Sequence, residues 1–160
     1  MNNIKILTLS QEMLSLYSDD IIDILESDTI ISNVWTHENI KIDLPGKWKY
    51  SNIAINKDNN KVQGFCICSR KGIGTVHIHK IYVHPLLLGQ GVGKKLLQKT
   101  IDTSLNNNIQ EISLFTFFSR ETAYKWYLKL GFKVFKILDN NTRAFMKGNV
   151  NIINENLKFK

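Results

Sequence analysis

Three glycines spaced two residues apart, Gly89, Gly91 and Gly93, stand between a segment rich in β-formers and an amphipathic helical pattern. Glycine lets the backbone turn tightly with its N–H groups facing inward, and a following helix adds the positive end of its dipole. Lys94 and Lys95 fall in the first turn of that helix, where cations are unfavourable unless an anion binds nearby. The spacing therefore predicts a loop that holds a pyrophosphate.

Two other phosphate-binding loops do not fit these residues. A Walker-type loop needs glycine at the position of Leu88 and Ser or Thr directly after Lys94, where Lys95 stands. A dinucleotide fingerprint needs glycine at Lys94 or Leu96 within a βαβ unit, and the strand expected here belongs to a series of hairpins. The remaining alternative is a glycine-rich loop that only connects a strand to a helix.

Two histidines, His77 and His79, flank Ile78 in a predicted strand, so both imidazoles should lie on one face of it. Paired imidazoles can pass a proton, bind zinc or serve only as structural or surface groups. A zinc site would need a third ligand, for which only His37 or His84 are obvious candidates. We therefore expect no metal.

Tyr127 lies on an apolar face formed with Ala123, Trp126 and Leu130, and Gly131 follows where a C′ glycine belongs. The helical spacing by itself favours a core aromatic residue. A reactive hydroxyl is the alternative, because tyrosine can exchange a proton in a transition state.

These residues must be positioned by a mixed α/β architecture. The hydrophobic patterns switch between a period of two and a period of 3.6 in the order β-α-α-β-β-β-α-β-α-β-β, which predicts a mixed sheet with helices on both faces. Two short helices are expected after Ser10, and a loop over 32–48. Strands are expected at 4–9, 50–56, 61–70, 75–83, 111–118, 132–138 and 142–146, and helices over 92–105 and 123–130.

Two motifs resemble those of the GNAT superfamily of N-acetyltransferases. The first is Val83-x-Pro85 followed by Gly89-x-Gly91-x-Gly93, and the second is Ala123-x-x-Trp126-Tyr127-x-x-x-Gly131-Phe132. The resemblance implies a GNAT-like fold with splayed central strands and acetyl-CoA as cosubstrate. The chain departs from the family at Leu88, where Arg or Gln is usual, and at Arg120, which replaces an Asn.

The resemblance also implies roles for particular residues. Backbone groups of Ile81, Tyr82 and Val83 would bind the pantetheine arm, and an N–H donor there would stabilise the developing oxyanion. Tyr127 would protonate the leaving thiolate. The full set of residues expected to bind acetyl-CoA is Ile81, Tyr82, Val83, Leu88, Gly89, Gln90, Gly91, Val92, Gly93, Lys94, Arg120 and Tyr127.

The base that accepts the amine proton is less defined. Phe115 stands where some relatives carry a Glu, so that route is closed. The stretch from His77 to His84 resembles a strand of aralkylamine N-acetyltransferases, which implies His79 or His77 as base or proton relay. The acceptor is expected to be a primary amine of a small molecule, with a peptide or protein amine as the alternative. Its expected contacts are Glu26, Trp35, His37 and Glu38.

Composition limits the class of protein. With 160 residues and 43% hydrophobic content, residues 1–150 are expected to form a single N-acetyltransferase domain, followed by a basic tail over 151–160. The formal charge is +7 and the isoelectric point about 9.4, yet no helix carries a dense basic stripe, so a phosphate-bearing cosubstrate is favoured over nucleic acid.

Location and assembly follow from weaker signals. The apolar runs are too short to span a bilayer, so a cytoplasmic protein without a membrane partner is expected. Cys66 and Cys68, two apart on one strand, are poorly placed to bridge and are expected to be buried thiols. A monomer or a homodimer fits the sequence. An acetyl-CoA sensor without catalytic activity, or a nucleic-acid-binding domain, remains the alternative function.

Overall fold

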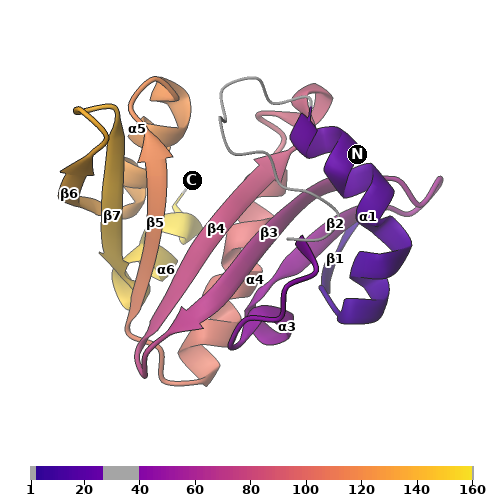
Figure 1. Cartoon of the computed structure of the whole chain (residues 1–160), viewed down its shortest axis with the longest axis horizontal. Helices are drawn as coiled ribbons and strands as arrows, with labels where there is room; N and C mark the ends of the chain where they lie inside the picture. Colours follow the sequence, from indigo (N-terminus) through magenta and orange to yellow (C-terminus); the bar gives the residue numbers. More distant parts are fainter. Residues whose placement is uncertain (1–2, 27–39, 160) are drawn as a thin grey trace.

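The computed structural model describes residues 3–26 and 40–159, with Glu26 described by its backbone alone. Its described strands form one seven-stranded sheet in the order β1-β2-β3-β4-β5-β7-β6 (Figure 1). Neighbouring strands are antiparallel except β4 and β5. The strands are β1 (Ile4–Thr8), β2 (Asn52–Asn56), β3 (Val62–Lys71), β4 (Thr75–Val83), β5 (Glu111–Phe117), β6 (Lys133–Leu138) and β7 (Arg143–Asn149). The predicted mixed sheet is confirmed.

Helices cover both faces of this sheet, as the sequence predicted. The described helices are α1 (Gln11–Glu26), α3 (Lys47–Tyr50), α4 (Val92–Asn106), α5 (Glu121–Leu130) and α6 (Val150–Lys158), with a 3₁₀ turn, η1, at Pro85–Leu87. Figure 1 shows α1 in front of the strands and α4 behind them. No helix within residues 3–26 and 40–159 is long and apolar enough to cross a membrane.

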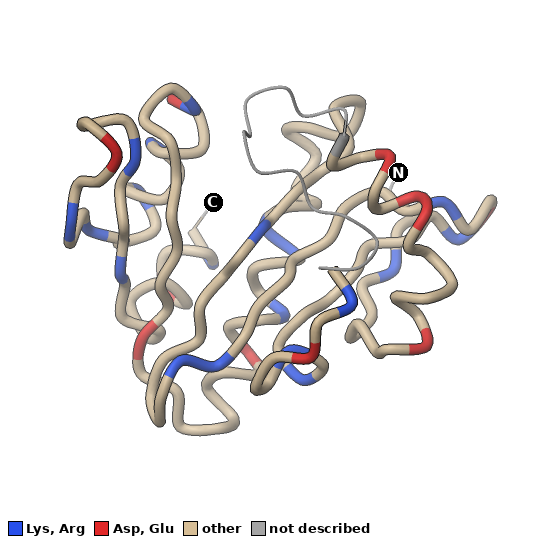
Figure 2. Tube along the Cα trace, viewed as in Figure 1, with Lys and Arg blue, Asp and Glu red and all other residues tan. Residues whose placement is uncertain are grey.

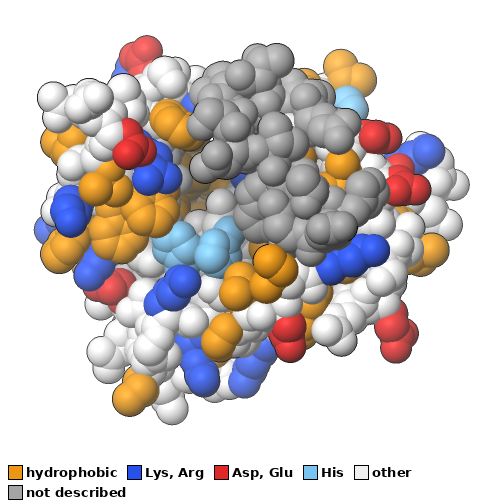
Figure 3. Space-filling view, viewed as in Figure 1, with side chains coloured by type: hydrophobic (Ala, Val, Ile, Leu, Met, Phe, Trp, Pro, Cys, Tyr) orange, Lys and Arg blue, Asp and Glu red, His pale blue; other side chains and the backbone are white. Residues whose placement is uncertain are grey.

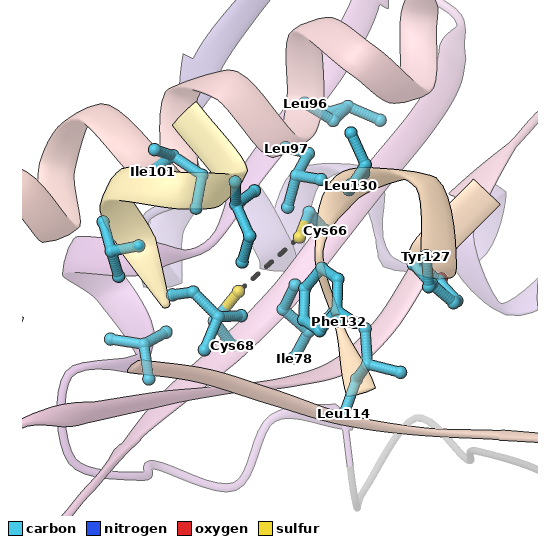
Figure 4. Close-up of a cluster of buried hydrophobic side chains, with 14 of the residues drawn as sticks. Cys66, Cys68, Ile78, Leu96, Leu97, Ile101, Leu114, Tyr127, Leu130 and Phe132 are labelled. Carbon is cyan, nitrogen blue, oxygen red and sulfur yellow. Dashed lines mark hydrogen bonds between the residues drawn. The ribbon is translucent and has the colours of Figure 1, made fainter. Parts of the chain in front are cut away.

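Side-chain alternation along β3 divides the core into two parts. Phe65 and Ile67 pack with α1 on one face, whereas Cys66 and Cys68 pack with α4, α5 and α6 on the other. Figure 4 shows the second cluster, in which the two thiols are buried and their sulfur atoms lie 3.5 Å apart without a covalent bond. The prediction of free buried thiols is confirmed.

The central strands β4 and β5 pair only at their beginnings, Thr75–Ile78 with Glu111–Leu114, and diverge beyond that point (Figure 1). The register with β3 gives a reason, because Cys68 pairs with Ile78 and Ile67 with Lys80, which leaves His79 as an extra residue. Such a β-bulge bends its strand and increases the local twist. The expected splay of the central strands is therefore present.

Two local predictions were wrong. The segment expected to form two short helices is one continuous helix over Gln11–Glu26. Of the loop expected over 32–48, residues 32–39 lie outside the described residues, and its last two residues begin α3. The expected basic tail over 151–160 is mostly α6. Its Val150, Ile153 and Leu157 are fully buried at helical spacing, and Asn149 Oδ1 caps it by accepting hydrogen bonds from the N–H groups of Asn151 and Ile152.

Candidate active site

The divergence of β4 and β5 opens a cavity of about 1180 Å³. Five of the residues predicted to act in catalysis or cofactor binding line it, three from β4 and two from α5 and its N-cap. They are His77, His79, Ile81, Arg120 and Tyr127. Figure 3 shows histidine side chains on this face beside a patch of hydrophobic side chains. The fold thus gathers the candidate proton-transfer residues around one space.

The glycine loop follows β4, the strand whose residues 77–81 line that cavity. His84 begins it, and its Nδ1 accepts a hydrogen bond of 3.1 Å from the Leu86 N–H. Gly89 and Gly91 have φ of +80° and +84°, a conformation that favours glycine, and a Cβ at either would meet no atom of the described residues within 4 Å. The backbone of the loop is therefore open to a ligand.

The other predicted loop residues differ in exposure. Leu88 and Gln90 are exposed, whereas the Val92 side chain is buried in the core, so Val92 can offer a ligand only its backbone. Gly93 and Lys94 belong to the first turn of α4, whose first N–H groups have no partner within the helix. A Cβ at Gly93 would lie 3.4 Å from Val83 Cγ2, so this turn sits close to the end of β4.

The second half of β4 presents a strand edge to the cavity. Ile81, Tyr82 and Val83 pair with β3 on one side only, because the pairing with β5 ends at Ile78. Among the described strands none pairs with the other edge of these three residues. Their backbone can therefore bind an extended ligand through strand-like hydrogen bonds.

Tyr127, on α5, lines the cavity between the diverging strands, and Figure 4 shows it in the buried cluster with Phe132. Its side chain is 6% exposed, and its ring packs 5.5 Å from Trp126 and 5.6 Å from Phe132 between ring centroids. Burial and the nearby Cys66 raise the pKa of the Tyr127 hydroxyl, which the Arg120 cation opposes. The hydroxyl is consequently protonated at neutral pH and able to donate a proton.

The predicted juxtaposition of His77 and His79 is confirmed, with ring centroids 4.9 Å apart. His77 Nδ1 lies 2.7 Å from Ser113 Oγ on β5, and His79 Nε2 lies 2.7 Å from Ser69 Oγ on β3. Burial is the main cause that lowers each pKa from 6.5 to about 4, and the Lys71 charge adds to it. Both imidazoles are therefore neutral at pH 7 and can accept a proton.

Sequence reasoning missed the role of Lys47, because lysine is rarely buried. Its side chain is 1% exposed, and its ammonium donates hydrogen bonds to the carbonyl oxygens of Ile40 and Ile42. Burial lowers its pKa, which the Asp43 carboxylate partly offsets. The Lys47 charge also contributes to the lowered pKa of His79.

The residues expected to contact the acceptor are mostly outside the described part of the chain. Trp35, His37 and Glu38 fall within residues 27–39, and the side chain of Glu26, at the end of α1, is not described either. Phe115, by contrast, lies on the cavity wall, so its position offers a ring and no carboxylate base. Around the histidine pair, the described cavity wall is formed by β4, β5 and β7.

Comparisons with known proteins agree with this geometry. A model of the acetyltransferase (GNAT) family matches residues 18–132. N-alpha-acetyltransferase 30 of Schizosaccharomyces pombe is 31% identical over 105 residues, which cover 61% of this chain and 69% of that protein.

Solved structures share the fold. Ard1 from Thermoplasma volcanium has a TM-score of 0.75 at 19% identity, over 92% of this chain and 97% of that one. A GNAT-family acetyltransferase from Staphylococcus aureus Mu50 has a TM-score of 0.76 at 23% identity, over 92% and 99%.

Proposed function

The chain belongs to the acetyltransferase (GNAT) family, and we propose that it moves the acetyl group of acetyl-CoA directly to a primary amine held in the cavity between β4 and β5. The observation that carries this proposal is the splay itself. It opens one edge of β4 and brings Tyr127 and the histidine pair to the same cavity, and the glycine loop follows directly after β4. Direct transfer needs the amine and the thioester in one such space.

Acetyl-CoA would be held chiefly by backbone groups. The N–H groups of the loop from Gly89 to Lys94 would bind the pyrophosphate at the positive end of α4, and the edge of β4 at Ile81–Val83 would bind the pantetheine arm. The open space over Gly89 and Gly91 fits this role. Leu88 cannot add a phosphate contact, because its side chain is apolar, but Arg120 at the start of α5 can supply a cation.

Tyr127 would act as the acid. When the tetrahedral intermediate collapses, the C–S bond breaks and CoA leaves as a thiolate that needs a proton. The raised pKa keeps the Tyr127 hydroxyl protonated until that step. Its place on the cavity wall, beside Arg120, suits this transfer.

His79 and His77 would receive the amine proton. A protonated amine cannot attack a carbonyl, so a proton must leave before or during C–N bond formation. With a pKa of about 4, neither imidazole removes a proton efficiently from a free ammonium ion, which has a pKa of about 8 or more. We assign them to relay the proton as the bond forms, when the nitrogen becomes far more acidic.

Two classes of acceptor are proposed. A primary amine of a small molecule is the expectation from the sequence. The α-amine of a peptide is the second, and the similarity to a curated N-alpha-acetyltransferase supports it. Both use the same chemistry, and they differ in how much of the acceptor must lie outside the cavity.

The test is release of free CoA thiol from acetyl-CoA in the presence of arylalkylamines, polyamines, aminoglycosides, amino acids and short peptides. Turnover with any class supports the transferase and identifies the acceptor type. Binding of acetyl-CoA without turnover across the panel would favour a sensor. Tight RNA or DNA binding that weakens steeply with salt and does not need acetyl-CoA would favour a nucleic-acid-binding domain.

A further inference from the structure

Three phenylalanines and two cations form a continuous surface on β5, β6 and β7, here named the aromatic wall. Phe115 and Phe145 are cross-strand partners with ring centroids 4.8 Å apart, and Phe135 adds an edge-on contact at 6.0 Å. The Lys147 ammonium lies 4.0 Å from the Phe135 ring centroid, and the Arg143 guanidinium 4.7 Å from that of Phe115. These residues define the aromatic wall.

Among the described helices, those that pack on these strands, α5 and α6, lie on the face opposite the aromatic wall. Leu114 and Met146, which alternate with the wall residues, are buried against α5 and α6. Phe115 is 43% exposed and Phe135 is 65% exposed. Phe135 is also the extra residue in the register between β6 and β7. A cluster of exposed aromatic rings is unusual on a soluble surface and marks a binding site.

The aromatic wall begins at the histidine pair. The ring centroids of His77 and Phe115 are 5.3 Å apart, and those of His77 and Phe145 are 6.3 Å apart. Phe115, Phe145, Arg143 and Lys147 all line the cavity that contains His77. A molecule whose amine reaches the histidine pair therefore has its neighbouring groups against the aromatic wall.

The charge around this cavity is predominantly positive, and Figure 2 marks basic residues on β4 and β7, which flank it. Among its described lining residues the cations outnumber the carboxylates five to two: Lys71, Lys80, Arg120, Arg143 and Lys147 against Glu111 and Asp139. Both carboxylates already pair with a wall cation, Asp139 with Arg143 at 2.8 Å and Glu111 with Lys147 at 3.7 Å. A polycation would be repelled here, and a carboxylate on the acceptor would be attracted.

We infer that the aromatic wall selects the acceptor. The preferred acceptor carries an aromatic or large apolar group next to its amine, and a carboxylate beyond that group. This inference rests on the proposed function and specifies its substrate class. The apolar group would pack on Phe145 and Phe135. The carboxylate would lie near Lys147, whose ammonium is 3.7 Å from Glu111 and therefore not in a close hydrogen bond with it. Polyamines and aminoglycosides would be poor acceptors.

The probes are four dipeptides with amidated C-termini, Phe-Glu, Phe-Lys, Ala-Glu and Ala-Lys, which separate the two features. Each is assayed by CoA release for kcat/KM at low salt. The kcat/KM of each Phe probe should be about tenfold higher than that of its Ala counterpart, because partial burial of one aromatic ring contributes about that much binding free energy. The Glu probes should exceed the Lys probes about threefold, an advantage that should shrink in 0.5 M NaCl.

Two variants connect these preferences to the aromatic wall. Phe135→Ala should reduce the Phe-over-Ala preference, and Lys147→Gln should reduce the Glu-over-Lys preference, each with unchanged acetyl-CoA affinity. The matched controls are Phe159→Ala and Lys158→Gln, which remove an exposed ring and an exposed cation at the end of α6. Both controls should keep both preferences. Thermal unfolding of every variant checks that the fold is intact.

Several results would overturn the inference and leave the proposed function standing. These are equal kcat/KM for all four probes, a preference for the Lys probes, or turnover of other amines with none of the four used. Loss of a dimer in Phe135→Ala during sedimentation, with probe preferences unchanged, would assign the aromatic wall to self-association instead. Absence of turnover with every amine, despite acetyl-CoA binding, would overturn the proposed function as well.

Discussion

Acidification should destabilise the fold through His77 and His79. Each has a pKa of about 4 in the folded chain, against an ordinary value of 6.5, and burial is the main cause. Between these two values the unfolded state binds more protons than the folded state, so stability rises with pH and falls as the solution is acidified. The loss is confined to the window from about pH 7.5 down to about pH 4.

The size of the effect follows from proton linkage. Consider a group whose pKa is 6.5 in the unfolded chain and about 4 in the folded chain. When the pH is lowered from 7.5 to 5.5, such a group lowers the free energy of unfolding by about 1.3 kcal/mol. The pair together should cost about 2.6 kcal/mol, a large share of the ~5–15 kcal/mol that typical domains possess. This range of pH lies above the ordinary pKa of Asp and Glu, so their contribution is small.

The assay is urea unfolding at pH 7.5 and pH 5.5, followed by circular dichroism, for the unaltered chain and for the double variant His77→Gln, His79→Gln. Glutamine preserves a polar partner for Ser113 and Ser69 but does not titrate. The double variant is expected to start from lower stability at pH 7.5, because it alters a buried site. Its loss between the two pH values should be smaller by about 2.6 kcal/mol.

An equal loss of unfolding free energy in the two proteins would refute this reasoning. It would mean that the imidazoles are solvated enough to titrate near their ordinary pKa in the folded chain. In that case one of them could be cationic near pH 6, and the assignment of a neutral pair that relays the amine proton would also fail.

Three further predictions concern the site and the fold. Tyr127→Phe should lower kcat about 100-fold while acetyl-CoA affinity, measured by calorimetry, changes less than about twofold, and full turnover would exclude Tyr127 as the acid. Gly91→Ala should weaken acetyl-CoA binding about tenfold, because a side chain is strained at φ of +84°. The control Gly72→Ala, at φ +73° in the β3–β4 turn, should lower the free energy of unfolding by a similar amount to Gly91→Ala but leave acetyl-CoA binding intact. Ile153→Ala in α6 should lower the free energy of unfolding, measured in urea, by about 2–5 kcal/mol. Ile152→Ala, at a half-exposed position, should lower it by less than about 1 kcal/mol, and equal losses would contradict the packing of α6 into the core.

Local sequence patterns predicted many of the helices, strands and turns of the fold. Alternation along β3 and β4, the helical spacing of Val92 to Leu105 and the glycine after Leu130 each reflect a neighbouring residue or the next turn, so they could be interpreted without the tertiary structure. The same holds for the glycine loop, whose positive φ values at Gly89 and Gly91 follow from what the backbone must do there. The helix α6 was not predicted, because lysines and asparagines surround Val150, Ile153 and Leu157 and the apolar face that these three form was not recognised.

The sequence by itself determined the family, the order of most elements and the side-by-side placement of His77 and His79, because these depend on residue type and on spacing along one element. Only the tertiary structure decided which serines bond the imidazoles, how far burial lowers their pKa values and how Lys47 is buried. It also decided that the aromatic wall meets the histidine pair. Phe115, Phe135 and Phe145 come from three strands, and their contact depends on strand pairing and on a one-residue bulge that local patterns do not encode.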